Sequence, residues 1–445
     1  MRTRALAAAA VVAAVSAPWS WVPASAGPPP PSMAVCSTSP VRFAPPTALG
    51  TGFEPSIDVD SKGNVFITGA AGGKGPSRLW RSADAGRTFQ EMLGLGPASG
   101  MFAGLEGDIT IDGKDRLYFV DTWYEDNYLY RYSDGGRTLD FFRPVIPSYE
   151  WVDDRPWLAA HHDGNVYYLG NNAARTGGRL TVHRSTDGGL TFDPSGFTFP
   201  ESGWGFIEAD PKSDYVYVVV NNLFSVDPDV VPQRSPWDTL SVWASADRGA
   251  TWRKHTVARY AKPWRNLGSM AWPSLVVSPT DGALTALWVT DAQSLQLARS
   301  TDRGRTWKRY DVSPFPGVFT FPRIAVAPNG DVGIVFDGHA YAERSSLWHL
   351  YAMVWSPDAG CARRTSAGWA SCKGPATAYG RIGPSFREAY SQGDFFQGAF
   401  TRAGVMHVAY DGVERTTSPK QVFHARQVSG PNMSGQRFCG VSGRP

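Results

Sequence analysis

The chain has 445 residues, of which 42% are hydrophobic, 13% aromatic and 19% charged, and its formal net charge is +3. The apolar content excludes a disordered chain, and the small net charge argues against a nucleic-acid partner. The 47 glycines show no three-residue period, which excludes collagen, and together with 17 Trp, 17 Tyr and 23 Phe they are typical of an all-β protein.

The N-terminal segment 1–26 reads as a secretory signal peptide. Arg2 and Arg4 precede an apolar run from Ala5 to Ala17, and Ala24–Ala26 fits a cleavage site, so the mature chain would begin at Gly27. A Pro-rich leader follows over 27–40. No later segment approaches the roughly 18 unbroken apolar residues of a membrane span. We therefore expect a secreted protein without a membrane span, and a monomer.

A short motif, Ser-x-Asp-x-Gly-x-Thr followed by an aromatic residue, recurs along the chain. Complete copies centre on Asp84, Asp187, Asp247 and Asp302, and degenerate copies on Asp134 and Asp358. A period of about 50 to 60 residues indicates a propeller or a solenoid. In such a motif the Asp carboxylate accepts backbone N–H bonds within a tight turn, and Gly adopts the left-handed conformation. We therefore expect structural roles for these six aspartates.

Seven pairs of apolar segments have the pattern of two strands joined by a turn. They cover 57–67, 109–120, 157–169, 206–220, 275–289, 324–336 and 396–410. The motif follows each of the first six pairs, whereas the seventh continues into 421–426 and lacks an outer strand. The segment 41–43 could supply that strand. The sequence therefore predicts one all-β domain over 41–440, a β-propeller of four-stranded antiparallel blades closed by the N-terminal strand, with seven blades preferred and six as the alternative.

Four cysteines in an exported chain predict two disulfides. Cys361 and Cys372 are close in sequence and would staple one loop. That pairing leaves Cys36 and Cys439 at opposite ends of the mature chain, where the closure of a propeller would bring them together.

Chain direction alternates through the four strands of a blade, so the connections that enter the innermost strands share one face and the Asp-motif turns occupy the other. The candidate binding residues entering these strands are Glu54, Glu106 with Asp108, Asp154, Arg155, Glu208, Trp272, Arg323 and Asp394. Carboxylates, arginines and aromatic rings on one concave face fit a polyhydroxylated ligand. The alternative is that these residues only pair with one another to line a wet channel.

The sequence contains no motif for a metal or a cofactor. The adjacent His161 and His162 would point to opposite faces of a strand. The acid-rich segment 121–126 could bind calcium through its oxygen atoms, but it lacks the EF-hand pattern. We therefore expect no cofactor, with calcium as an unsupported possibility.

The motif series resembles the sialidase (neuraminidase) superfamily, and in particular secreted bacterial proteins with BNR, or Asp-box, repeats. The resemblance implies a glycan or glycoconjugate as partner and, if the protein is an enzyme, a glycoside hydrolase of the exo-sialidase type. Sialidases use an arginine triad, a Tyr nucleophile activated by Glu, and an Asp acid/base. The matching candidates here are Arg155, Arg323 and Arg387 for the triad, Tyr390 with Glu208 or Glu388 for the nucleophile, and Asp394 as a further catalytic residue.

Three departures separate this chain from the sialidase pattern. Sialidases have six blades, whereas seven are predicted here. Their Phe/Tyr-Arg-Ile-Pro motif lies near the N-terminus, whereas only 321–324 is similar here, in another order and in the sixth unit. No motif fixes the proposed triad or nucleophile. A non-catalytic protein- or glycan-binding propeller and a structural envelope protein are therefore the alternatives to a glycan-acting enzyme.

Overall fold

A computed structural model describes the chain over residues 36–37, 41–72, 75–92, 104, 106–123, 126–145, 156–170, 179–200, 203, 205–222, 238–260, 272–290, 294–343, 348–356, 360–365, 368–373, 376–386, 395–412 and 419–430. The predicted signal peptide lies outside these residues. Every regular element within them is a β-strand, as the composition predicts. No helix in the described ranges has the length and apolarity that a membrane crossing requires.

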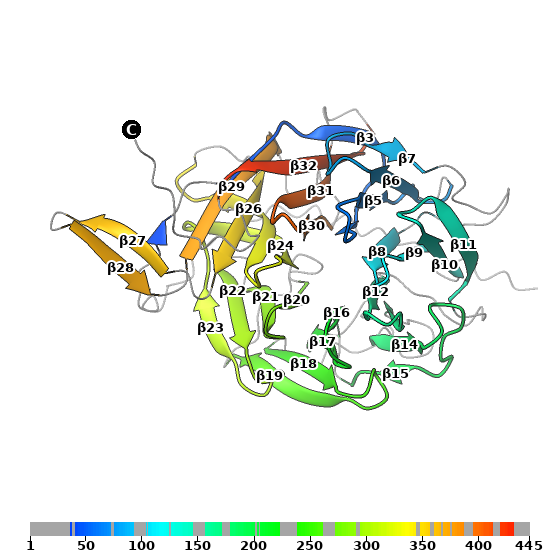
Figure 1. The fold of residues 1–445 in the computed structure, drawn as a ribbon. Coiled ribbons are helices and arrows are strands. Elements are labelled where there is room, and N and C mark those ends of the chain that lie inside the picture. The colour runs from blue at the N-terminus through cyan, green and yellow to red at the C-terminus, as the bar shows by residue number, and fades with distance from the viewer. Residues whose placement is uncertain are drawn as a thin grey trace, which may run out of the picture. The chain divides into compact units, whose positions relative to one another are not determined.

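The strands form seven blades, each built on four antiparallel strands of which the first is innermost (Figure 1). Blade 1 consists of β4 (Ile57–Val59), β5 (Val65–Gly69), β6 (Arg78–Ser82) and β7 (Gln90–Glu91). Blade 2 consists of β8 (Glu106–Ile111), β9 (Leu117–Trp123), β10 (Asp126–Ser133) and β11 (Thr138–Pro144). Blade 3 consists of β12 (Trp157–Ala160), β13 (Val166–Gly170), β14 (Thr181–Ser185) and β15 (Phe197–Thr198).

The next two blades repeat this order without interruption. Blade 4 consists of β16 (Gly205–Ala209), β17 (Val216–Asn221), β18 (Thr239–Ser245) and β19 (Arg253–Arg259). Blade 5 consists of β20 (Ser274–Val277), β21 (Leu284–Thr290), β22 (Ser294–Ser300) and β23 (Lys308–Asp311). The second strands are buried along almost their whole length, because neighbouring blades cover both faces of each sheet.

Blade 6 is larger than the others. Its sheet consists of β24 (Gly317–Val326), β25 (Val332–Ala340), β26 (Trp348–Ser356) and β29 (Ala376–Phe386), and β1 (Cys36–Ser37) pairs with β29 in parallel. The hairpin of β27 (Gly360–Thr365) and β28 (Gly368–Lys373) interrupts the chain between β26 and β29. In that hairpin Cys361 is the register partner of Cys372.

The N-terminal strands complete blade 7. The C-terminal part of the described chain supplies three strands of this blade, β30 (Gln397–Phe400), β31 (Met406–Gly412) and β32 (Gln421–Ser429). Two strands from the start of the chain, β2 (Arg42–Phe43) and β3 (Thr47–Thr51), pair with β32 in antiparallel orientation. The predicted closure by 41–43 is therefore confirmed, and β3 extends it.

The seven innermost strands form a closed ring. Each of β4, β8, β12, β16, β20, β24 and β30 contacts the next one, and β30 contacts β4. Figure 1 shows these strands surrounding the centre of the propeller. The prediction of seven blades is confirmed, and the six-bladed alternative is wrong, because the seventh hairpin takes its outer strands from the N-terminal segment.

Candidate functional site

The Asp-motif turns connect the third strand of a blade to its fourth, and four of them have the same internal bonding. In the first turn, Asp84 Oδ1 accepts a bond from the backbone N–H of Thr88 at 2.9 Å, and Asp84 Oδ2 accepts one from Thr88 Oγ1 at 2.7 Å. Ser82 Oγ donates to the same carboxylate at 2.7 Å. Equivalent bonds hold Asp187, Asp247 and Asp302. These four carboxylates thus accept hydrogen bonds from residues of their own turns.

The bonding in these turns favours the ionised form of the Asp carboxylate. Bonds from Thr306 lower the pKa of Asp302 to about 2, and the equivalent bonds from Thr88 lower the pKa of Asp84 further. In the degenerate second copy, the Asp134 carboxylate forms an exposed ion pair with Arg137 at 3.4 Å. Asp358 lies outside the described residues.

Three carboxyl groups converge on the central channel from three different blades. Asp58 lies on β4, Asp108 on β8 and Glu208 on β16, and all three line one cavity of about 350 Å³. Each of these strands is the innermost strand of its blade. Along an inner strand, apolar residues that pack within the blade alternate with residues that face the ring centre. The three carboxyl side chains belong to the second set and reach the channel.

Asp108 is anchored by the neighbouring inner strands. Its Oδ1 accepts a bond from Ser56 Oγ at 2.6 Å and one from Gln397 Nε2 at 3.4 Å. Its Oδ2 accepts a bond from the backbone N–H of Leu158 at 2.8 Å. The carboxyl of Asp108 therefore links blades 7, 1, 2 and 3 at the channel wall.

Burial raises the pKa of all three channel carboxyls. The pKa of Asp108 rises to about 6, although the bonds from Ser56 and Leu158 oppose the shift. The pKa of Asp58 rises to about 7, and that of Glu208 to about 8 because the charges of Asp58 and Asp108 add to the cost of burial. At neutral pH the channel therefore contains both protonated and ionised carboxyl groups.

Arg323 and Trp272, two of the predicted binding residues, belong to an aromatic cluster at the channel. The Arg323 guanidinium carbon lies 5.0 Å from the Trp157 ring and 4.5 Å from the Phe395 ring. Trp272 packs against the same two rings and donates its indole N–H to the carbonyl of Gly205. Both predicted residues are buried, so their side chains hold this cluster together.

Glu54 and Glu106 lie beside the aromatic cluster. Together with Trp157, Phe395 and Gln397 they line a narrow cavity at the start of the inner strands. Glu54 has a φ of +48°, a left-handed conformation that a residue other than glycine adopts at a cost. Glu106 is buried, with 8% of its surface exposed.

Six predicted site residues lie outside the described residues: Asp154, Arg155, Arg387, Glu388, Tyr390 and Asp394. Of the predicted arginine triad, the structure describes only Arg323, and of the predicted catalytic residues only Glu208. Cys439 is also outside, and the side chains of the other three cysteines are not described. The predicted disulfides, the triad and the nucleophile therefore stay predictions.

Sequence reasoning missed Asp58 and the two residues that anchor Asp108, Ser56 and Gln397. A signal for Asp58 exists in the sequence. It is the polar residue between two apolar ones in Ile57–Val59, so on an inner strand it has to face away from the blade's apolar contacts. Ser56 and Gln397 lie 341 positions apart, and only the closure of the ring brings them together.

The described residues contain no group of three or more His, Cys, Asp or Glu side chains placed to hold a metal ion.

Comparison with known proteins identifies the fold but no family. No family model and no curated protein matches this chain. Among solved structures, an ulvan lyase from a family of polysaccharide lyases is similar at 10% identity, with a TM-score of 0.53 over 86% of this chain and 95% of that chain. The same kind of lyase bound to -[GlcA(1-4)Rha3S]- matches with a TM-score of 0.51, also at 10% identity and over the same shares of both chains.

Sialidases are also among the matching structures. An intramolecular trans-sialidase from Ruminococcus gnavus is similar at 13% identity over 87% of this chain and 94% of that chain, with a TM-score of 0.39. At 10% identity the likeness to the ulvan lyase shows a shared fold, and the fold alone does not carry the chemistry.

Proposed function

We propose that this protein is a secreted glycan-directed propeller whose site is the central channel, and that its carboxyl groups cleave a glycosidic bond by acid–base catalysis. The observation that carries the proposal is the convergence of Asp58, Asp108 and Glu208 on one cavity, with pKa values of about 7, 6 and 8. Each of these values lies near neutral pH, where proton transfer is most effective.

Cleavage of a glycosidic bond needs one group that gives a proton to the leaving oxygen and one that is ionised. Enzymes obtain both from carboxyls whose surroundings push their pKa values apart. Glu208 has the highest pKa of the three and is protonated at neutral pH, which suits the role of general acid. Asp108 has the lowest and is mainly ionised, which suits the role of base or charge stabiliser.

Two further observations support a glycan as the substrate. The fold is similar to that of an ulvan lyase, which has been solved with a saccharide bound. The Asp motifs resemble those of sialidase-like proteins, so an exo-sialidase is the first enzyme to test. In that case Arg155, Arg323 and Arg387 would bind the carboxylate of the sialic acid, and Tyr390 would be the nucleophile.

A glycan outside the cell requires export. The signal peptide over 1–26 would provide it, and disulfides between Cys361 and Cys372 and between Cys36 and Cys439 would form in the oxidising compartment. We propose that the exported protein acts as a monomer.

One observation favours a second function, glycan binding without turnover. Asp108 accepts bonds from Ser56, Gln397 and Leu158, so its carboxyl is part of the framework that joins the inner strands. If the channel carboxyls serve only to join the inner strands, the channel would bind a ligand without cleaving it.

The experiment is a turnover panel with the chain from Gly27 onward. It contains a fluorogenic sialoside, a set of neutral aryl glycosides, and acidic polysaccharides assayed both for new reducing ends and for the unsaturated products of lyases. Each substrate is also tested for binding. Turnover of any member supports the catalytic proposal, and binding without turnover supports the second function. If the protein neither binds nor cleaves any member, the glycan-directed proposal is wrong.

A further inference from the structure

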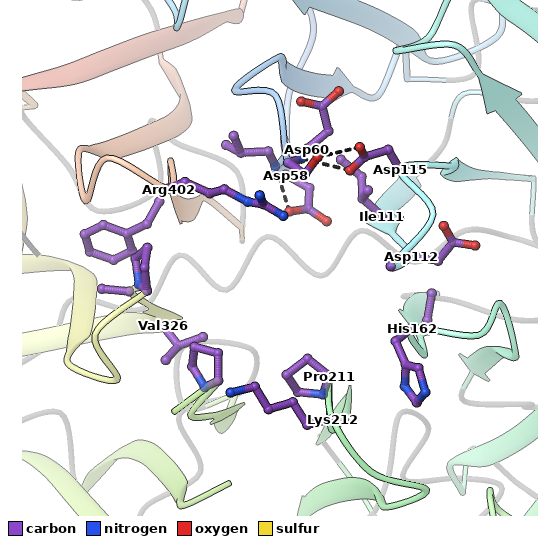
Figure 2. A pocket seen from close by; sticks show the side chains of 18 residues that line it. Asp58, Asp60, Ile111, Asp112, Asp115, His162, Pro211, Lys212, Val326 and Arg402 are labelled. Atoms are coloured by element: carbon purple, nitrogen blue, oxygen red, sulfur yellow. Dashed lines mark hydrogen bonds between the residues drawn. The ribbon is translucent and has the colours of Figure 1, made fainter. Parts of the chain in front are cut away.

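A second and larger cavity opens where each blade turns from its first strand to its second. This cavity, the lower basin, has a volume of about 660 Å³, within the range of ligand sites in proteins. The lining comes from all seven blades and includes Asp58, Asp112, His162, Lys212, Val326 and Arg402 (Figure 2). These turns share one end of the blades with the Asp-motif turns, opposite to the face that the sequence analysis favoured.

The lower basin is continuous with the channel. Asp58, Ile111 and Val326 line both cavities, so Asp58 lies where the basin narrows into the channel. A ligand bound in the basin would therefore reach at least one of the three channel carboxyls.

The carboxylates of most acidic residues in the lower basin accept hydrogen bonds from nearby residues. Asp60 accepts bonds from the backbone N–H groups of Lys62 and Asn64. Asp112 accepts bonds from Arg116 and Tyr118. Asp115 accepts two bonds from Ser61, which Figure 2 shows as dashed lines. These three carboxylates hold the turns, whereas Asp58, within the part of the chain that the structure describes, accepts a bond from the backbone N–H of Val59 at 2.7 Å.

The basic residues of the lower basin are not occupied in this way. Arg402 and Lys212 are exposed, and neither has a carboxylate within 4.0 Å in the parts of the chain that the structure describes. Figure 2 shows Arg402 extending from the blade 7 side toward Asp58, and Lys212 and His162 at the far edge of the opening. The basin thus presents two cations at its rim that have no ion-pair partner among the described residues, the carboxyl of Asp58 at its floor, and the turn-bound carboxylates of Asp60, Asp112 and Asp115 in its wall.

We propose that the lower basin binds an acidic sugar residue, whose carboxylate or sulfate contacts Arg402 and Lys212 while a ring hydroxyl bonds to Asp58. This inference rests on the proposed glycan function and names the substrate class and the side of entry. A guanidinium offers paired N–H donors that match a carboxylate or sulfate, and Lys adds a second positive charge. The pKa of Asp58, raised to about 7 by burial, lets the carboxyl either donate to or accept from a hydroxyl.

The experiment uses an array of uronic-acid, sialic-acid and sulfated oligosaccharides, each printed beside its carboxyl-reduced or desulfated counterpart. The chain from Gly27 onward is compared with the double variant Arg402→Gln and Lys212→Gln. The control is the double variant Lys62→Gln and Arg305→Gln, which removes the same charge from described residues that do not line the basin. All four residues are in turns, so the fold should tolerate both changes.

We expect binding to acidic members above their neutral counterparts, weakened about tenfold in the basin variant and unchanged in the control. The carboxyl-reduced and desulfated members show which anion is recognised. Equal binding by the basin variant, or indifference to removal of the acidic group, would overturn the inference and leave the glycan function standing. Absence of binding to every member would overturn the inference, and the glycan function would fall with it only if the turnover panel is also silent.

Discussion

Nδ1 of His407 lies 2.9 Å from Nε2 of His424, and the two stacked rings are buried beneath the turn that carries Gly86. The two histidines belong to β31 and β32 of blade 7, whereas Gly86 belongs to the Asp-motif turn of blade 1. The contact of the two histidines with this turn is therefore one of the places where the first and last blades meet.

We predict that this pair stays neutral well below the usual pKa of histidine. Burial lowers the pKa of His407 to about 4 and that of His424 to about 3. An unfolded histidine binds its proton near pH 6.5, so the pair's contribution to stability is full above pH 6.5 and is lost as the pH falls toward 4. NMR of the imidazole carbons should show two histidines that do not titrate between pH 8 and 5. Titration of all eight near pH 6.5 would contradict the assignment.

Replacement of Gly86 should disrupt the closure. A Cβ at this position would lie 2.7 Å from His407 Cε1 and 2.8 Å from His424 Cε1, and the φ of +76° is costly for alanine. We expect Gly86→Ala to lower the free energy of unfolding by about 2–3 kcal/mol. Gly63→Ala is the matched control, because Gly63 has a φ of +84° but nothing within 4 Å of a Cβ, and should cost about 1 kcal/mol. Equal losses in urea denaturation would show that the histidine contact does not matter.

The pH dependence of stability that comes from the channel carboxyls should be opposite to the one that comes from the histidine pair. The pKa of Glu208 is raised to about 8, whereas the unfolded residue ionises near its ordinary value of 4.5. Its contribution is therefore full below pH 4.5 and is lost as the pH rises toward 8. Glu208→Gln cannot ionise, so it should stabilise the protein at pH 8 by about 1–2 kcal/mol and hardly at pH 4. A gain of the same size at both pH values would show that Glu208 ionises normally in the fold.

The repeats of the sequence predict the fold well because each hairpin has its own pattern. Apolar alternation marks the two inner strands, and the Asp motif marks the turn between the outer two. The strand β2 is predicted because blade 7 otherwise lacks an outer strand. The strand β3 is not, because Thr47–Thr51 contains a glycine and has no alternating pattern.

The candidate site is predictable only in part. Glu208 and Asp108 are identified as acidic residues on predicted inner strands, although Glu208 is the fourth residue of β16 and not near its start. Asp58 was missed because the sequence analysis considered residues that enter the inner strands, whereas Asp58 is the middle residue of β4 and also lines the lower basin. Arg323 and Trp272 are buried against Trp157 and Phe395, and Arg323 also lines the channel cavity, so their predicted role in ligand binding stays a prediction. Sequence position shows which end of a strand a residue occupies, but burial depends on side chains from other blades.

The two disulfides predicted from the sequence can be tested directly. Cys361 and Cys372 are register partners in the antiparallel pair of β27 and β28. Peptide mapping of the unreduced protein should recover these two cysteines in one linked pair, and Cys36 with Cys439 in another. Free thiols at Cys361 and Cys372, or crossed pairs, would contradict the prediction.

The most direct test of the central claim is the pH dependence of turnover by the wild type and by Glu208→Gln, on the best glycan substrate of the panel. If the channel carboxyls cleave the glycan, Glu208→Gln should lower kcat by about a hundredfold or more with little change in KM. The decline of wild-type activity above about pH 8 should also disappear in the variant. The control Asp302→Asn, in an Asp-motif turn, should keep wild-type kcat. A wild-type kcat and pH profile in Glu208→Gln would show that the channel carboxyls are not the catalytic groups.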